Sequence, residues 1–112
     1  MLNYALLVFA LTAVGGLILA AHVLRNKFAP WAISLIHAFF GATGLVLLIT
    51  ILVSGSAPQR VLIAFALLVI AALGGFFLAS FHLRKKLPPK AVVIIHAGVA
   101  VAGFLTLLSA VV

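Results

Sequence analysis

The four histidines of the chain are the side chains best suited to chemistry, and they occur as two pairs. His22 and His37 flank the turn of the stretch HVLRNKFAPWAISLIH, and His82 and His96 flank the similar stretch HLRKKLPPKAVVIIH. Each stretch joins two apolar segments through a short turn that contains proline and basic residues. An ionisable side chain in a membrane span costs free energy and is by default a functional residue, so this repeated pattern predicts a binding site.

Three roles are open for these imidazoles. In the first, histidines from diagonally opposed helices ligate the iron of haem b, and Arg25 and Arg84 in the basic turns bind its propionates. In the second, the four imidazoles hold a bare metal ion. In the third, they are structural and bond to neighbouring carbonyls or lipid headgroups. A bare divalent ion would bring its full charge into a chain without Asp or Glu, whereas the porphyrin cancels most of the iron charge, so haem is favoured.

His37 and His96 are the predicted axial ligands. They match at an offset of 59 residues, whereas His22 matches Phe81, one residue before His82. Metal bonds of fixed length tolerate such a slip less well than flexible contacts do, so His22 and His82 are predicted to contact the propionates or to be alternative ligands. Because helical side chains lean toward the N-terminus of their helix, the four imidazoles are expected to converge on one level.

Four apolar segments position these histidines. Hydrophobic residues make up 68% of the 112 residues and charged residues only 6%, against about a quarter charged residues in soluble domains. A membrane-spanning helix needs about 20 apolar residues. The sequence offers four such stretches, which are Leu2 to Leu24, Trp31 to Ser54, Val61 to Leu83 and Ala91 to Val112. The prediction is an all-α polytopic membrane protein, an up-down four-helix transmembrane bundle in a lipid bilayer.

The basic residues predict the orientation of this bundle. Six of the seven lie in or beside the first and third turns, and the middle loop holds only Arg60. By the positive-inside rule, these two turns are cytoplasmic and both termini are outside, which in a bacterial inner membrane is the periplasm. Since the net charge of +7 is confined to helix ends, it indicates membrane topology rather than nucleic-acid binding.

The single transmembrane domain, residues 1–112, consists of two tandem two-helix repeats, residues 1–56 and 57–112. The residues that match at the offset of 59 include Gly15-Gly16 with Gly74-Gly75, Arg25 with Arg84, Pro30 with Pro89, and Gly44 with Gly103. Gly44 and Gly103 each lie seven residues after a predicted ligand, two turns along the same helix face. Small residues there allow a neighbouring helix to pack closely, and they equally leave space for a flat cofactor.

The stretch GGLILAAHVLRNKFAPWAISLIHAFFGATG resembles the transmembrane b-type cytochromes of the four-helix diheme kind, and the second half of the chain repeats its pattern. In that family an apolar helix ends in a basic turn and the next helix carries a ligating histidine. The resemblance implies bis-histidine haem ligation and electron transfer, with ligand roles first for His37 and His96 and secondarily for His22 and His82. That family holds its two haems on opposite sides of the membrane. All four histidines lie on one side here, so one haem per bundle, or haems shared in an oligomer, are expected.

Composition also bears on other functional classes. Small multidrug-resistance transporters have this size and topology but depend on a membrane-embedded glutamate, and this chain has no acidic residue. No hydroxyl side chain has a base and an orienting acid beside it, so hydrolase chemistry is not supported. The alternative to an electron carrier is a non-catalytic accessory or scaffold subunit of a larger membrane complex. An electron carrier would need a quinone or a redox protein as its partner. The protein itself is expected to form a homo-oligomer or to belong to a larger membrane complex.

Overall fold

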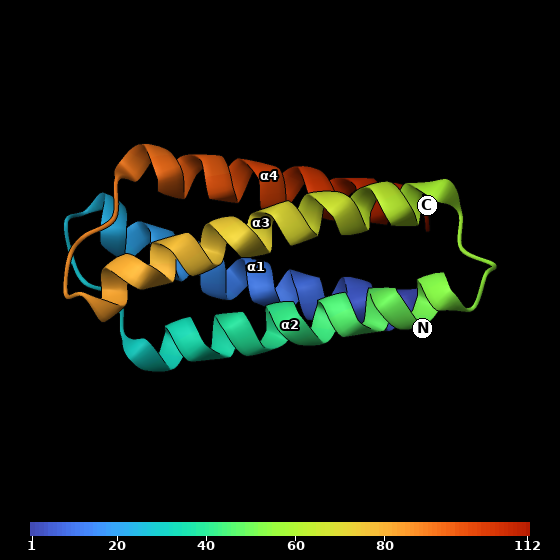
Figure 1. Cartoon of the computed structure of the whole chain (residues 1–112), viewed down its shortest axis with the longest axis horizontal. Helices are drawn as coiled ribbons and strands as arrows, with labels where there is room; N and C mark the ends of the chain where they lie inside the picture. Colours follow the sequence, from blue (N-terminus) through green and yellow to red (C-terminus); the bar gives the residue numbers. More distant parts are fainter.

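The computed structural model describes residues 1–112 and contains four α-helices and no strands (Figure 1). The helices are α1 (Leu2–Leu24), α2 (Trp31–Val53), α3 (Gln59–Leu83) and α4 (Lys90–Ser109). Each is long and apolar enough to cross a membrane, so the chain is an integral membrane protein and the predicted all-helical fold is confirmed. The largest difference from the predicted segments is at the C-terminus, where α4 ends at Ser109 rather than at Val112.

Prolines mark the start of three helices. Pro30, Pro58 and Pro89 are the N-cap residues of α2, α3 and α4, with φ of −62°, −61° and −57°. Proline has no backbone N–H and its φ is fixed near about −65°, so at a helix start it costs no hydrogen bond. The helices therefore run across the bundle without an internal proline, as the sequence predicts.

The basic turns after α1 and α3 have the same backbone structure. Arg25 and Arg84 cap the two helices, and each guanidinium Nε donates to the carbonyl four residues earlier, at 3.0 and 3.1 Å. The next residues, Asn26 and Lys85, are left-handed, with φ of 60° and 56°. A cation at a helix C-terminus also complements the helix dipole. The local geometry of the turns thus recurs at the offset of 59 residues.

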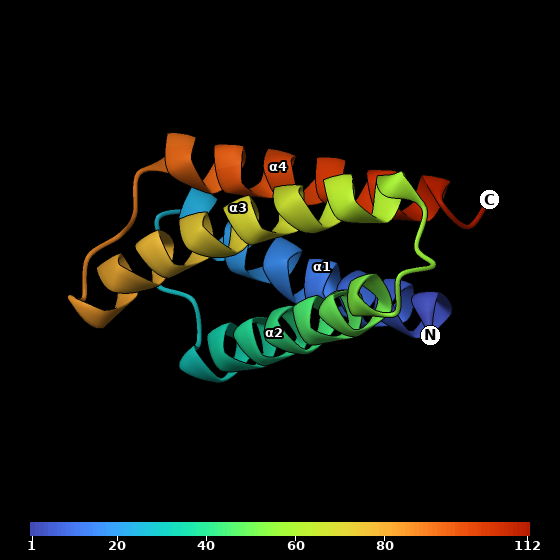
Figure 2. The ribbon, with the colours of Figure 1, turned by 45° about the vertical axis from the view of Figure 1, so that its right-hand side comes forward.

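The helices associate as two hairpins. Helix α1 packs along α2, and α3 packs along α4, whereas the contacts of α1 with α4 and of α2 with α3 are sparser (Figure 2). The pairs α1–α3 and α2–α4 are diagonal and have no close backbone approach. Both termini lie at the same end of the bundle as the α2–α3 loop (Figure 1). The interface between the two hairpins is called the seam below, and the end that carries the two basic turns is called the basic end.

The hydrophobic core lies toward the end that carries the termini. Its fully packed residues are Ala5, Phe9, Leu48, Val61, Ala64, Leu68 and Leu107. Toward the basic end, Val93 is the only buried residue. Most other apolar side chains face outward, as expected for helices whose outer surface contacts lipid rather than water. The seam is therefore closed by side chains at the terminal end and weakly packed at the basic end.

The threonine hydroxyls within the helices are bonded to their own helix. Thr12, Thr43, Thr50 and Thr106 each donate to the carbonyl four residues earlier, at distances of 2.8, 2.8, 3.0 and 2.7 Å. Lipid offers no hydrogen-bond partner, so this pattern satisfies each hydroxyl without help from a neighbouring helix. The polar side chains that do reach between helices are chiefly those of the histidines.

Candidate functional site

His37 reaches from α2 to the backbone of α1. Its Nδ1 lies 2.8 Å from the carbonyl oxygen of Thr12. A carbonyl can only accept a hydrogen bond, so Nδ1 is the nitrogen that donates a proton to it, and Nε2 makes no hydrogen bond. Metal-ligating histidines have this arrangement, in which one nitrogen donates to a carbonyl and the other is free for the metal.

Two adjacent glycines make the Thr12 carbonyl accessible. Gly15 and Gly16 lie three and four residues after Thr12, where the side chains of a helix would cover that carbonyl. The His37 ring rests on them, because a Cβ built on Gly16 would be 3.0 Å from Cε1 of His37, and one built on Gly15 would be 3.6 Å from its Cβ. The glycine pair of α1 is thus the surface that receives the imidazole of α2.

His96 occupies the equivalent position in the second hairpin. Its ring lies against Gly74 and Gly75, and a Cβ built on Gly75 would be 3.3 Å from Cε1 of His96. Ala71 is the counterpart of Thr12 and presents its carbonyl to this ring, but the buried Nδ1 of His96 falls short of a well-formed hydrogen bond. A buried polar atom without a partner is costly. His96 is therefore the less well satisfied imidazole of the two.

The imidazoles of His37 and His96 meet at the seam. Their centroids are 6.3 Å apart and their planes are inclined by 79°, although they come from α2 and α4, which lie diagonally across the bundle. Two metal–nitrogen bonds of about 2 Å, added to the radii of two five-membered rings, put the centroids of paired ligands about 6 Å apart. The separation thus suits two ligands of one metal centre.

The other two histidines lie apart from this pair. His22 is half-buried, and its Nδ1 is 2.8 Å from the carbonyl of Ile18 in its own helix. His82 stacks on Trp31, with centroids 3.7 Å apart and planes inclined by 7°, and its Nδ1 is 3.3 Å from the hydroxyl of Ser34. No three histidines are close enough to hold a metal ion. The four imidazoles therefore do not form one cluster, and a bare metal ion on four histidines loses its support.

The physical reason is rotation about the helix axis. A slip of one residue turns a side chain by about 100° around a helix of 3.6 residues per turn. His82 is one residue beyond the position equivalent to His22, so the two side chains leave α3 and α1 in different directions. His82 points at the start of α2, where Trp31 offers a stacking surface. Depth along the membrane was therefore the wrong criterion for these two residues.

Gly44 and Gly103 are packing positions in this structure. A Cβ built on Gly44 would be 2.6 Å from the Phe9 ring, and one built on Gly103 would be 2.8 Å from Cγ of Leu68. Phe9 and Leu68 also match at the offset of 59 residues, so both hairpins make the same contact. Side chains of α1 and α3 already fill the space over these glycines, and a flat cofactor there would have to displace them. The expectation that this stripe leaves room for a cofactor is not met.

Arg25 and Arg84 are exposed at the basic end. Each is tied to its own helix through Nε, and the guanidinium of Arg84 also lies over the Phe81 ring, 4.7 Å from the centroid. The chain has no acidic side chain that could neutralise either cation. Both guanidinium groups are thus available to an anionic partner, and their predicted contact with haem propionates stays a prediction.

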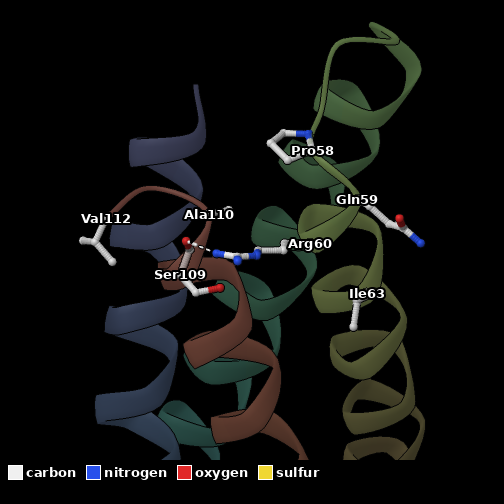
Figure 3. Close-up of a pocket in the computed structure, with 7 residues that line it drawn as sticks. All are labelled: Pro58, Gln59, Arg60, Ile63, Ser109, Ala110 and Val112. Carbon is white, nitrogen blue, oxygen red and sulfur yellow. Dashed lines mark hydrogen bonds between the residues drawn. The ribbon is translucent and has the colours of Figure 1, made fainter.

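Two surface hollows lie at opposite ends of the bundle. The one at the terminal end measures about 530 Å³ (Figure 3), and its lining residues are Pro58, Gln59, Arg60, Ile63, Ser109, Ala110 and Val112. Across it, Nη1 of Arg60 donates to the carbonyl of Ser109 at 3.0 Å and so satisfies a carbonyl at the end of α4. The second hollow lies between the two basic turns. Neither of these hollows includes His37 or His96.

Comparisons of the chain with protein families, with curated proteins and with solved structures find no match. The site is therefore interpreted from its own chemistry. It offers two imidazoles that carry no compensating carboxylate, in a setting without cysteine. Such a donor set suits a metal whose charge is already largely balanced, because an unpaired charge in apolar surroundings is expensive.

Sequence reasoning missed the residues that support the two imidazoles. The glycine pairs are visible in the sequence as a repeat, but the sequence does not show which side chains lie on them. The structure shows that each pair receives a histidine from the neighbouring helix. The repeated Gly-Gly was the available signal, since two adjacent small residues expose a helix backbone more fully than one does.

Proposed function

We propose that the protein is a membrane-embedded electron carrier that binds haem b through His37 and His96. The observation that carries this proposal is the pair of imidazoles, which come from diagonal helices and lie 6.3 Å apart at the seam. Histidine is the common ligand of haem iron in such proteins, and bound haem would supply a one-electron iron couple. This proposal agrees with the resemblance of each half to the four-helix diheme cytochromes.

The residues around the pair would hold and tune the ligands. The carbonyl of Thr12 fixes the tautomer and the orientation of His37, and a hydrogen bond of this kind raises the basicity of the ligating nitrogen. Ala71 offers the equivalent carbonyl to His96. Arg25 and Arg84 would supply cations to the propionates at the basic end. The apolar helices exclude water from the pair and so favour a group with little net charge.

Space for the macrocycle is the further requirement, and the seam is where the bundle can provide it. Each histidine rests on the glycine pair of its own hairpin. The hairpins are held together mainly by the core at the terminal end, and Val93 is the only buried residue near the basic end. Movement of the hairpins at the basic end would therefore leave each histidine on the glycine pair of its own hairpin and would leave the core intact.

The proposal includes an orientation and partners. Because six of the seven basic residues are at the basic end, that end would face the cytoplasm and both termini the periplasm of a bacterial inner membrane. A quinone or a redox protein would exchange electrons with the site. The unpartnered outer surface of the helices would permit a homo-oligomer or a place in a larger membrane complex.

A visible absorption spectrum tests this function directly. Protein purified from cells supplied with a haem precursor is expected to be red and to give a sharp low-spin spectrum after reduction with dithionite. The double variant His37→Ala/His96→Ala, expressed in the same way, is the matched control and is expected to be colourless. A wild-type protein that is colourless and also fails to bind haemin added in detergent would contradict the proposal. That result would favour the accessory subunit instead.

A further inference from the structure

The hollow at the basic end lies across the seam. It measures about 410 Å³, and its lining residues are Phe28, Ala29, Pro30, Trp31, His82 and Lys85. Phe28 to Trp31 form the end of the first basic turn and the first residue of α2. His82 lies near the end of α3, and Lys85 lies in the turn that follows. Both hairpins thus contribute to one hollow, which is called the seam hollow below.

The seam hollow has an aromatic wall and one cation. The indole of Trp31 stacks on the imidazole of His82, and Nδ1 of His82 is 3.3 Å from the Ser34 hydroxyl, so the wall joins the two hairpins. Lys85 is the cation, and no acidic side chain exists in the chain to pair with it. An ammonium group without an internal partner is free to bind an anion from outside.

The internal repeat is broken at this place. The positions equivalent to Phe28, Trp31 and Lys85 are occupied by Leu87, Lys90 and Asn26. Pro30, Arg25 and the pair Gly15-Gly16 are in contrast identical to their counterparts Pro89, Arg84 and Gly74-Gly75. The aromatic side chains and the cation that line this hollow therefore have no counterparts in the other half of the chain.

Backbone conformation supports this interpretation of Lys85. Its φ of 56° is left-handed, as is the φ of 60° of its counterpart Asn26. Asparagine adopts this conformation readily, whereas a long side chain does so at a cost. Asparagine would therefore adopt this turn conformation at a lower cost than lysine does. The presence of lysine here favours a binding role for its ammonium group.

We propose that the seam hollow binds the headgroup of an anionic phospholipid, with the Lys85 ammonium on the phosphate. The hollow lies at the helix ends, where headgroups lie in a bilayer, and basic pockets between transmembrane helices bind such lipids. Phe28 and Trp31 are 52% and 43% exposed, and aromatic side chains at this level favour the boundary between headgroups and acyl chains. These apolar rings favour a lipid over free phosphate.

In the protein without haem, the bound headgroup contacts both hairpins and therefore holds the basic end of the seam together. This role complements the weak packing there, where Val93 is the only buried residue. It does not depend on haem, because none of the lining residues is a proposed axial ligand. A protein without haem would still bind the lipid, so failure of either proposal leaves the other testable.

Trp31 provides the measurement, because it is the only tryptophan in the chain and forms a wall of the hollow. The purified protein in a neutral detergent is titrated with short-chain phosphatidylglycerol, with phosphatidylcholine of the same chain length, and with inorganic phosphate. The expected result is a saturable change in Trp31 emission with phosphatidylglycerol, and at most a weak change with the other two. Equal saturation by phosphatidylcholine or by inorganic phosphate would overturn the proposal.

Lys85→Asn is the decisive variant, because it introduces the residue found at the equivalent position 26 and suits the left-handed backbone. Its affinity for phosphatidylglycerol is expected to fall about tenfold, since a charge-assisted hydrogen bond is lost. Lys86→Asn is the matched control, as it removes the same charge from the next residue, which does not line the hollow. Its affinity is expected to change less than about twofold. An equal loss in both variants would show general surface attraction and would refute a specific site.

A second measurement checks the stabilising role. Phosphatidylglycerol is expected to raise the thermal midpoint of unfolding of the wild type and of Lys86→Asn, because a ligand that binds the folded state stabilises it. The rise is expected to be largely absent in Lys85→Asn. An identical rise in all three proteins would contradict a headgroup site that joins the hairpins.

Discussion

The imidazoles of His37 and His96 lie 6.3 Å apart across the seam, yet each is held by its own hairpin. His37 hydrogen bonds to α1, with which α2 is packed, and His96 rests on α3, with which α4 is packed. The pair thus forms where the two hairpins meet, and each hairpin contributes one ring. Changes that separate the hairpins alter the distance between the rings without moving either ring off its glycine pair.

The first prediction concerns the ligands themselves. Alanine replacement of His37 or of His96 is expected to abolish the low-spin haem spectrum, because each variant removes one of the two imidazoles that lie together at the seam. His22→Ala and His82→Ala are expected to retain it, since these side chains bond elsewhere. Haem quantitation and a reduced-minus-oxidised spectrum of the four single variants make the comparison. A normal spectrum in His37→Ala and His96→Ala, with loss in the other two, would move the ligands to α1 and α3.

The second prediction concerns packing of α2 on α1. Gly44→Ala is expected to destabilise the fold by about 1 to 3 kcal/mol, because its Cβ would be 2.6 Å from the Phe9 ring and neither helix can move freely. Gly98→Ala is the control, as a Cβ there meets nothing within 4 Å. Equilibrium unfolding in mixed detergent micelles measures both.

A double variant separates this clash from other effects of the added methyl group. Phe9→Ala/Gly44→Ala is expected to be more stable than the sum of the two single changes implies, since truncation of the ring removes the clash. Strict additivity of the two changes would mean that Gly44 and Phe9 do not interact in the membrane.

The helices and the proximity of His37 and His96 could be predicted from the sequence for identifiable reasons. Spans of about 20 apolar residues bounded by proline leave few alternatives in lipid, and the structure differs from them by only a few residues at helix ends. The proximity of His37 and His96 follows from the repeat, because equal positions in equivalent hairpins face the same seam. Their predicted role as ligands remains to be tested.

The contacts of His22 and His82 could not be predicted in the same way. The sequence gives the depth of a residue along its helix, but the direction of its side chain depends on which neighbour is close. His82 turned toward Trp31 and Ser34, whereas His22 found a carbonyl of its own helix. Gly44 likewise offered space in the sequence that the Phe9 ring takes up in the structure.

The third prediction is the orientation in the membrane. Both termini lie at the end opposite the basic turns (Figure 1), so one reporter at Val112 locates both. A reporter that is active only outside the cytoplasm is expected to be active there, because six of the seven basic residues mark the other end as cytoplasmic. A fusion in the turn between α3 and α4 is the control and should give the opposite result. Activity of a cytoplasm-only reporter at Val112 would reverse the orientation while leaving the fold unchanged.

The fourth prediction tests the contact of the His37 ring with two adjacent glycines of α1. Gly16→Ala would put a Cβ 3.0 Å from Cε1 of His37, whereas for Gly15→Ala the nearest atom of that residue is 3.6 Å away, an ordinary contact. Both variants gain about 0.5 to 1 kcal/mol of helix propensity, so any difference between them reports on the imidazole. Gly16→Ala is expected to shift the ring off the Thr12 carbonyl and to be the less stable of the two.

Nitrogen-15 NMR of the His37 ring provides a measurement that does not require haem. In the wild type and in Gly15→Ala, Nδ1 is expected to carry the proton, because it donates to the carbonyl of Thr12. In Gly16→Ala that preference is expected to weaken, since the displaced ring loses the bond that selects the tautomer. If Gly15→Ala disturbed the ring as much as Gly16→Ala, the glycine pair would not be a specific seat, and the ligating orientation of His37 would have to come from another contact at the seam.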